Sequence, residues 1–328
     1  MPALVTGSDK LVDALDCPTA FERARHEMEF IRRNRIDCFG YNDPEYPSRL
    51  RECNDAPTLL FYKGNTPLNQ LKVINLVGTR HATDYGKEVC RTFLRDLRQL
   101  CPEVLIVSGL AYGIDIHAHR AALEYGFATV GVLAHGLDRI YPSAHRQTAV
   151  QMLKQGGLLT EFMSGTNPDR QNFVMRNRIV AGMCDATIVI ESAAKGGALI
   201  TADLAEGYHR DCFAYPGRSY DPYSQGCNAL IRDNRAALIQ SAEEFVKAMC
   251  WDMTSSAQTP VQRQLFPDLT DEEKALVQVL QASPDGLPIN ELAVAAGLPV
   301  NQLSALLFEM EIKGVAQALP GNRYKVLL

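Results

Sequence analysis

The sequence predicts an α/β protein built on a Rossmann-like, doubly wound, mostly parallel sheet. Three observations predict this fold class. Short apolar, β-branched runs recur from residue 71 onward, segments of helical length separate them, and the runs end in turns that contain glycine. Continuously apolar strands are buried on both faces, which is typical of a parallel sheet covered by helices. Right-handed crossovers then place helices on both sides of that sheet.

Residues 1–65 are expected to form a small helical N-terminal region. Residues 10–35 mix acidic and basic side chains in a helical pattern, and a turn-rich stretch then leads to the short apolar run LLFYKG. We predict one or two helices followed by an extended segment. The basic residues Arg32, Arg33 and Arg35 are expected to be a solvated helix end, with a phosphate contact as the alternative.

Residues 66–250 are expected to form the Rossmann-like domain itself. The strand pattern occurs at 73–78, 104–109, 128–133, 186–191 and 212–217. Segments of helical length occur at 84–100, 115–126, 143–155, 173–183 and 198–208. Strands and helices therefore alternate along this domain, as a doubly wound topology requires.

The C-terminal part predicts a linker and a winged helix. Residues 251–268 are polar and contain Ser, Gln and Pro, which is a linker composition. Residues 269–328 predict a helix with an acidic first turn, two helices joined at Gly297 and Pro299, and a hairpin with its turn at PGN. The candidate recognition helix, 300–312, contains no Lys or Arg, whereas reading of duplex DNA needs basic side chains there. We therefore expect this domain to contact protein or itself.

Charge and composition exclude several classes of protein. The net charge is −5, so a generally basic surface is excluded. Residues 66–250 carry 19 basic and 18 acidic side chains, whereas the flanking regions are both net acidic, so an anion site is expected in the middle. Nine cysteines without a CxxC pair predict reduced thiols in a cytosol. The sequence has neither an apolar run of about 18 residues nor a secretory leader, so no membrane association is expected.

The glycine turns predict an anion-binding site. They occur at Gly78, Gly109, Gly136 and Gly196-Gly197, each after a predicted strand. The carboxyl ends of strands in an open α/β sheet form one crevice, where glycine exposes backbone N–H groups and helix N-termini favour negative charge. Simple packing is the alternative explanation of each single glycine. The chain contains neither GxGxxG nor a Walker loop, so a dinucleotide site and a P-loop are not expected.

Basic residues accompany these turns. Arg80 follows the first predicted strand, and Lys195 directly precedes Gly196. The guanidinium group of arginine is a planar fork that can bind phosphate through two hydrogen bonds. Arginine is therefore the expected phosphate ligand of this crevice.

A second pair of arginines lies on one predicted helix. Arg176 and Arg178 flank Asn177, and side chains two residues apart on a helix point in different directions, so one can reach a ligand while the other braces the fold. Phe173 lies three residues before Arg176, and an aromatic ring beside arginine suits base stacking on a single strand. In the alternative, Phe173 is a core anchor and the arginines pair with Glu161 and Asp185.

The histidines and carboxylates of the central domain complete no catalytic or metal set. His117 and His119 would face different sides of a helix, and no nearby Cys or His spacing completes a zinc site. Asp115 begins a predicted helix, where an N-cap role is expected. No nucleophile, base and orienting residue occur together, and GxSxG is absent. We therefore expect no metal, no cofactor and no enzymatic activity.

Six motifs follow one another in the central domain. They are VGTR (77–80) followed by YG (85–86), SGLAYGID (108–115), LAHGLDRIYPSAH (133–145), PDRQNFVMRNRIVAG (168–182), GGALITADLA (196–205) and YPGRSYDPYSQGCNALI (215–231). In this order they resemble the DNA-processing protein DprA (Smf) family over about 71–240. The linker and winged helix resemble the optional C-terminal domain of that family.

The resemblance implies a bacterial cytosolic protein of natural transformation. Such a protein binds incoming single-stranded DNA, protects it from nucleases and loads the recombinase RecA onto it, as a homodimer formed through the Rossmann-like domain and without known catalysis. Carried over residue by residue, the resemblance implies a DNA-binding pocket of Arg80, Ser108, Gly109, Phe173, Arg176, Asn177, Arg178, Lys195, Gly196, Gly197 and Thr201.

The sequence departs from the family pattern in three places. The usual SGS before LIT is Gly196-Gly197-Ala198 here, so one hydroxyl contact is missing. Val174 stands where a proline often follows the phenylalanine. The N-terminal helix-hairpin-helix region of longer relatives is short or truncated, which puts its contribution in doubt.

Two other classes of function remain as hypotheses. A nucleotide-processing enzyme resembling the phosphoribohydrolases would carry a PGGxGTxxE-type motif that supplies a catalytic glutamate, whereas this chain has KGGALITADLA with no Glu at that spacing. A winged-helix transcription factor would need basic side chains on its recognition helix, where this chain has Glu309 and Glu311.

Overall fold

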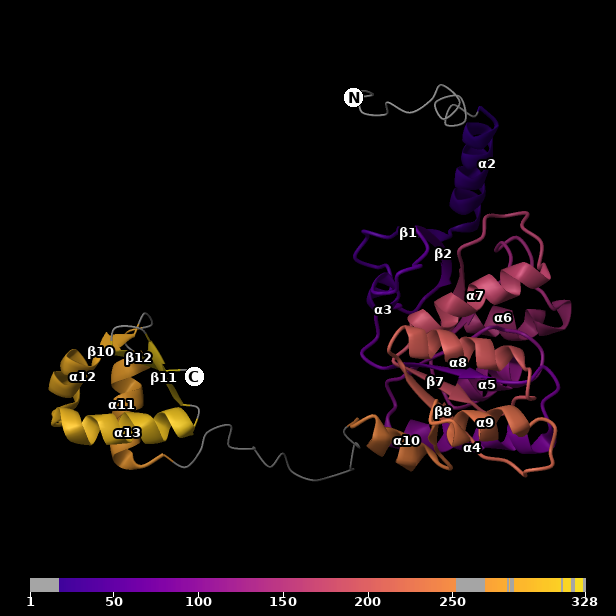
Figure 1. Cartoon of the computed structure of the whole chain (residues 1–328). Helices are drawn as coiled ribbons and strands as arrows, with labels where there is room; N and C mark the ends of the chain where they lie inside the picture. The colour runs from indigo at the N-terminus through magenta and orange to yellow at the C-terminus, as the bar shows by residue number, and fades with distance from the viewer. Residues whose placement is uncertain are drawn as a thin grey trace, which may run out of the picture. The chain divides into compact units, whose positions relative to one another are not determined.

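The computed structural model of the chain describes residues 18–251, 269–281, 283, 286–313, 315–319 and 322–326 (Figure 1). These residues fall into two compact units, divided between residues 255 and 256. The predicted linker, 251–268, lies outside the described residues except for Trp251. The Trp251 ring packs against Phe245 of the first unit with 5.4 Å between ring centroids, so this residue of the predicted linker belongs to the first unit.

The first unit is built on one large sheet with the strand order β1-β2-β6-β5-β4-β3-β7-β8-β9. Its described strands are β1 (Asp37–Gly40), β2 (Leu59–Gly64), β3 (Val73–Val77), β4 (Leu105–Ser108), β5 (Thr129–Val132), β6 (Gly156–Thr160), β7 (Ala186–Val189), β8 (Asp211–Ala214) and β9 (Ala237–Leu238). Neighbouring strands from β6 to β9 are parallel, and only the β1–β2 and β2–β6 pairs are antiparallel. The predicted fold class, a mostly parallel Rossmann-like sheet, is confirmed.

Helices cover both faces of this sheet. The helices of the first unit are α2 (Pro18–Asn34), α3 (Ser48–Arg51), α4 (Asp84–Leu100), α5 (Ile114–Glu124), the short 3₁₀ helix η1 (Ser143–His145), α6 (Arg146–Met152), α7 (Arg170–Gly182), α8 (Gly197–Gly207), α9 (Gln225–Arg232) and α10 (Ala242–Ala248). One face carries α4, α5, α6 and α10, and the other carries α3, α7, α8 and α9. Figure 1 shows α7 and α8 side by side, and the parallel pairing of β3 with β7 places the loops at their carboxyl ends near each other.

The alternation of side chains along β3 shows why the strand runs are continuously apolar. Val73 and Val77 belong to the core under α7 and α8, whereas Ile74 and Leu76 belong to the core under α4 and α5. Successive strand residues point to opposite faces, so a strand between two helical layers must be apolar at almost every position. The one polar residue, Asn75, is fully buried and donates its amide to Thr187 Oγ1 at 2.8 Å.

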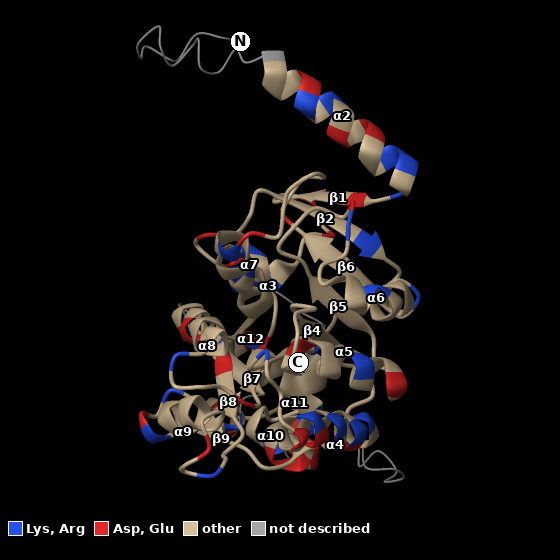
Figure 2. Ribbon diagram, turned by 90° about the vertical axis from the view of Figure 1, so that its right-hand side faces the viewer, with Lys and Arg blue, Asp and Glu red and all other residues tan. Residues whose placement is uncertain are grey.

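The predicted boundary at residue 65 is wrong, because residues before it belong to the same sheet. β1 pairs with β2, and β2 pairs with β6 through Phe61 opposite Thr160. Of the predicted helix 10–35, the part from residue 18 is described and forms α2, which carries acidic and basic residues along its length (Figure 2). The Glu27 carboxylate of α2 is buried and accepts hydrogen bonds from the Ser164 amide and hydroxyl, which fixes this helix to the loop after β6.

The sequence pattern matches the five predicted strands but does not predict β6 or β9. β6 begins with Gly156-Gly157, and glycine weakens the strand pattern because it provides no side chain to pack. A bulkier residue does not fit there, since a Cβ on Gly157 would lie 2.4 Å from the Tyr62 ring. β9 has only two residues, too few to show any alternation.

The second unit is a winged helix. It contains α11 (Asp271–Gln281), β10 (Leu287–Pro288), α12 (Ile289–Ala296), α13 (Val300–Ile312), β11 (Ala316–Leu319) and β12 (Arg323–Val326), with the sheet order β10-β12-β11. The predicted joint between the second and third helices is correct, and Gly297 ends α12 in a left-handed conformation with φ of 65°. Residues 320–321 of the predicted PGN turn lie outside the described residues, and the strands on either side of them pair as an antiparallel hairpin.

In the described part of the chain, no single helix has both the length and the apolar character to span a membrane. The pair α12 and α13, bent by 103°, satisfies those criteria only when taken together. Leu292 of α12 and Leu303 and Leu307 of α13 are fully buried in the winged-helix core.

Candidate functional site

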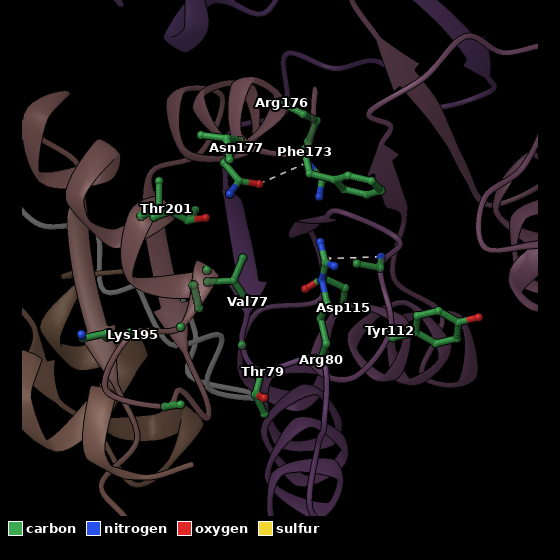
Figure 3. Close-up of a pocket in the computed structure, with 18 of the residues that line it drawn as sticks. Val77, Thr79, Arg80, Tyr112, Asp115, Phe173, Arg176, Asn177, Lys195 and Thr201 are labelled. Carbon is green, nitrogen blue, oxygen red and sulfur yellow. Dashed lines mark hydrogen bonds between the residues drawn. The ribbon is translucent and has the colours of Figure 1, made fainter. Parts of the chain in front are cut away.

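A pocket of about 380 Å³ opens at the carboxyl end of β3. The strand order reverses here, because β4 pairs with one side of β3 and β7 with the other. Ligands of open α/β sheets bind at such a switch point. Figure 3 shows the walls, which are the turns after β3 and β4, the first half of α7, and the loop that enters α8. The lining residues are Val77, Gly78, Thr79, Arg80, Ala111, Tyr112, Asp115, Arg170, Phe173, Val174, Arg176, Asn177, Ala193, Lys195, Gly196, Gly197, Ala198, Ile200 and Thr201.

Arg80 and Phe173 face each other in this pocket. The Arg80 guanidinium lies 5.0 Å from the centre of the Phe173 ring, within cation–π range (Figure 3). The Arg80 side chain is exposed, and no carboxylate pairs with it among residues 18–251. Phe173 is half-buried, and the Tyr141 ring lies 6.0 Å from it. The pocket therefore combines an accessible positive charge with a half-buried aromatic ring.

Arg176 lies beneath this pair as a buried brace. Its side chain is 4% exposed, and its Nη1 donates to the Gly109 carbonyl at 2.6 Å and also to the Val132 carbonyl. Burial lowers the pKa of Arg176 to about 10, while the nearby Asp115 carboxylate opposes that shift, so the guanidinium stays charged at neutral pH. Arg176 thus ties α7 to the ends of β4 and β5 and places a fixed positive charge at the pocket floor.

The Arg176 brace explains why residue 109 is glycine. A Cβ on Gly109 would lie 2.3 Å from the Arg176 guanidinium, so a side chain at 109 would expel it. Ser108 is fully buried and donates its hydroxyl to the Leu76 carbonyl at 2.7 Å. Neither residue lines the pocket. The prediction that Ser108 and Gly109 are direct pocket ligands is therefore wrong, because both are covered by the fold and Gly109 acts through Arg176.

Arg178 also lies outside the pocket, and its predicted place there is wrong. It lies two residues after Arg176, so its side chain leaves α7 on another side. It pairs with the Glu161 carboxylate and donates to the Asp55 carbonyl. The pairing with Glu161 is the alternative that the sequence left open, whereas Asp185 pairs with Arg49 at 2.5 Å. Arg178 therefore connects α7 to the N-terminal segment.

The loop entering α8 forms the opposite wall. Gly196 is the N-cap of α8, and no side chain caps this helix end. Nothing lies within 4 Å of a Cβ placed on Gly197, so the backbone there is open to a ligand. Thr201 is buried against the wall, whereas the exposed Lys195 directs its ammonium group outward (Figure 3). An uncapped helix N-terminus offers backbone N–H donors and a partial positive charge to an anion.

Asp115 is the one carboxylate among the lining residues. It is 8% exposed, and burial raises its pKa, an effect that Arg176 opposes. The predicted N-cap role is wrong, because Gly113 occupies the N-cap of α5 and Asp115 lies in the first turn. Its Oδ2 accepts a long hydrogen bond of 3.4 Å from the Ala111 amide. Asp115 therefore balances the Arg176 charge from within the wall.

Arg170, Thr79 and Tyr112 line the pocket although the sequence did not predict them as site residues. Arg170 and Asn177 share one helical face with Phe173, because they lie three residues before it and four after it. Extending that spacing backward from Phe173 would have found Arg170, which is exposed. Thr79 and Tyr112 lie in the turns after β3 and β4, and no periodic pattern marks them.

Within the described residues, no group of three or more His, Cys, Asp or Glu side chains is arranged to hold a metal ion. His119 is fully buried, and its Nδ1 lies 2.8 Å from Thr129 Oγ1. His117 is half-buried on another side of α5, as the two-residue spacing predicts. The absence of a metal and a cofactor from the function stays a prediction.

Fold and pocket together define a class of protein: a Rossmann-like domain with an arginine-bearing pocket at its switch point, followed by a winged helix. Comparison with known families agrees. The family model described as DNA recombination-mediator protein A matches residues 37–250, and the model described as DprA winged helix domain matches residues 260–322. The chain belongs to the DprA (Smf) family of DNA-processing proteins, so the predicted family is confirmed.

Individual relatives cover most of the chain. Protein Smf of Synechocystis sp. is 32% identical over 314 residues, which span 87% of this chain and 78% of that protein. The DNA processing protein DprA of Streptococcus pneumoniae is 39% identical over 212 residues, which span 65% of this chain and 74% of that protein.

Two solved structures share the fold. The X-ray structure of S. pneumoniae DprA superposes with a TM-score of 0.61 at 39% identity, over 65% of this chain and 74% of that chain. The DNA processing protein A of Helicobacter pylori superposes with a TM-score of 0.60 at 28% identity, over 66% of this chain and 97% of that chain. The H. pylori protein is described as having a unique single-stranded DNA binding mode.

Proposed function

We propose that this protein is a single-stranded DNA-binding recombination mediator that acts in the bacterial cytoplasm. It protects incoming DNA and loads RecA onto it during natural transformation, as a homodimer and without cutting the strand. The observation that carries the proposal is the pocket in which the exposed Arg80 guanidinium faces the Phe173 ring. Family membership and the H. pylori relative described for single-stranded DNA binding support it.

The pocket offers separate places for a phosphate and a base. Arg80 and the uncapped N-terminus of α8 lie at the same pocket and supply donors for one phosphate group. Phe173 supplies a ring on which a base stacks regardless of its identity. The proposed binding therefore depends on the backbone and on stacking, with no sequence readout.

The dimensions of the pocket favour one strand over two. It holds about 380 Å³ and is bounded by three loops and the first half of α7. In a duplex the bases are stacked and paired inside, so a ring recessed between loops cannot reach them without opening the helix. We therefore propose a preference for single strands.

Gel-shift titration of single-stranded and duplex oligonucleotides across a salt series tests this function. We expect preferential single-strand binding that weakens steeply as salt rises, because phosphate contacts release counterions. Arg80→Ala should weaken binding to every sequence alike. Equal affinity for both forms of DNA, or full affinity in Arg80→Ala, would refute the proposed site.

Three further measurements test the remaining parts of the proposal. RecA loading is tested by RecA ATP hydrolysis on single strands already coated with a single-strand binding protein, where adding this protein should shorten the lag. Sedimentation should show a dimer. Incubation with nucleoside monophosphates should release no free base, and release would favour the phosphoribohydrolase alternative.

A further inference from the structure

A second cavity, of about 430 Å³, adjoins the first pocket. It lies between the turn after β3 and the start of α5, and Arg80 and Tyr112 line both cavities. Arg80 therefore stands on the border between two hollows on the same edge of the sheet. The other lining residues are His81, Ala82, Lys87, Gly113 and His117.

The charge of this second cavity is one-sided. Its lining contains one arginine, one lysine and two histidines, and no lining residue carries a carboxylate. The Lys87 ammonium pairs with Asp84 at 2.9 Å, but the Asp84 side chain is fully exposed, so water screens this pair. Lys87 can therefore turn toward an anion at little cost.

The backbone adds a partial positive charge at the same place. α5 is an 11-residue helix, and its N-cap is Gly113, which provides no side-chain cap. Gly113 has φ of 79°, and a Cβ there would lie 2.0 Å from the Thr79 carbonyl, so the α5 N-terminus is held tightly against the turn after β3. The Ile114 amide donates to this Thr79 carbonyl at 3.1 Å, so the α5 N-terminus contributes its partial positive charge to the second cavity.

The aromatic residues continue across the border. Tyr112 is 50% exposed and packs edge-on against His145, with 5.0 Å between ring centroids. On the other side, His81 lies 6.2 Å from the Tyr223 ring. Figure 3 shows Tyr112 across the pocket from Lys195, so a ring is available on the side of the first pocket that leads to the second cavity.

We infer that the second cavity is a second phosphate subsite for the same single strand, in which Lys87, His117 and the α5 N-terminus bind the phosphate next to the one held by Arg80. Tyr112 is the stacking surface between the two subsites. This inference rests on the proposed function, since it extends the single-strand site of the first pocket. The strand then crosses the sheet edge from α8 toward α4.

His117 suits this role in either protonation state. Burial, followed by the nearby charges of Arg120, Lys87 and His145, lowers its pKa, so the free protein holds a neutral imidazole that still donates one N–H. A phosphate beside it favours the charged form. The positive charge of the second subsite therefore increases when a phosphate binds there.

The test compares a long strand with a single nucleotide. The double variant Lys87→Ala/His117→Ala is titrated with a fluorescent twenty-residue thymidine strand and, by NMR, with thymidine 5′-monophosphate. We expect about a tenfold loss of affinity for the strand, a shallower salt dependence, and less than a twofold change for the nucleotide. Arg80→Ala should weaken binding of both ligands, and Lys154→Ala, an exposed lysine away from both cavities, should change neither.

The outcomes separate the two proposals. Unchanged strand affinity in the double variant overturns the second subsite and leaves the proposed function intact. An equal loss for strand and nucleotide also overturns it, since the substitutions would then act through the first pocket. The midpoint of thermal unfolding of each single variant shows whether it is folded. If Lys87→Ala lowers that midpoint, Lys87→Gln replaces it in the double variant. Failure of the wild-type protein to bind the strand refutes both proposals.

Discussion

The switch-point pocket and helix α13 of the winged helix differ in the chemistry that they expose. The pocket exposes Arg80, which no carboxylate neutralises among residues 18–251, beside an aromatic ring. Helix α13 exposes Phe308 at 63% and Ile312 at 73%, with no basic residue along it. A polyanion is attracted to the first surface and not to the second. The difference fits the proposal that the α/β unit binds DNA, and it leaves an apolar face on α13 for contact with protein.

A second contrast lies within the α/β unit. The sequence predicts both Arg80 and Arg178 at the pocket. In the structure Arg178 pairs with a carboxylate, whereas Arg80 has no carboxylate partner among residues 18–251. Arg178 has Glu161 and the Asp55 carbonyl as partners and is withdrawn from ligand binding. The charge of a residue therefore indicates a site only when its partners are known.

The largest effect is expected from Arg176→Met. This change leaves the Gly109 and Val132 carbonyls without their buried donor and Asp115 without its compensating charge. We expect a loss of about 3 kcal/mol of unfolding free energy from the α/β unit. Urea unfolding followed by fluorescence measures it, because Trp251, the one tryptophan of the chain, packs in that unit. A loss below about 0.5 kcal/mol would show that Arg176 is not the brace.

The double variant Arg80→Ala/Lys195→Ala is expected to have the next largest effect. It removes two accessible charges from the pocket, and we expect about a thirtyfold weaker affinity for single strands, or about 2 kcal/mol. Fluorescence anisotropy at fixed salt measures it. Lys325→Ala, on the wing strand β12, is the matched control from the other unit and should change affinity less than twofold. If Lys325→Ala weakened single-strand binding more than the pocket variant did, the winged helix and not the pocket would be the main DNA-binding surface.

Acid should destabilise the α/β unit, which contains all seven histidines of the chain. Burial, and then the charges of Arg176 and His145, lowers the pKa of His119 to about 3. The unfolded chain takes up this proton below about pH 6.5, whereas the folded chain does not, so stability is present above pH 6.5 and falls as pH falls toward 3. At pH 5 this one group costs about 2 kcal/mol.

Urea unfolding at several pH values measures this dependence. In His119→Gln the mean slope of unfolding free energy between pH 6.5 and 5 should fall by about 1 kcal/mol per pH unit. His26→Gln, on the exposed side of α2, should leave the slope as it is. An unaltered slope in His119→Gln would mean that other groups carry the acid sensitivity.

The smallest effect is expected from Phe308→Ser/Ile312→Ser. These side chains lie on the exposed face of α13, so the core of the winged helix stays intact. We expect less than a twofold change in single-strand affinity, measured as for the Arg80 variant. A tenfold loss would place DNA on α13 and remove the distinction between the two units.

Much of the fold follows from local pattern. The strand at 73–77 and the helix at 84–100 match their predicted ranges within one residue, because a continuous apolar run and helical spacing can be recognised from a few consecutive side chains. The N-terminal segment shows the limit of this reasoning. Its strand β2 looks like an isolated apolar run, and only its pairing with β6, almost a hundred residues later, makes it part of the sheet.

By itself, the sequence determined the α/β class and the order of the family motifs, and it predicted an anion site at glycine turns after the strands. It also determined that Arg176 and Arg178 must point in different directions. Only the tertiary structure decided that both are internal, and that Arg80, Phe173 and the α8 N-terminus form the accessible surface. The physical reason is that the direction and charge balance of a side chain depend on partners distant in sequence, such as Glu161 for Arg178 and Gly109 for Arg176.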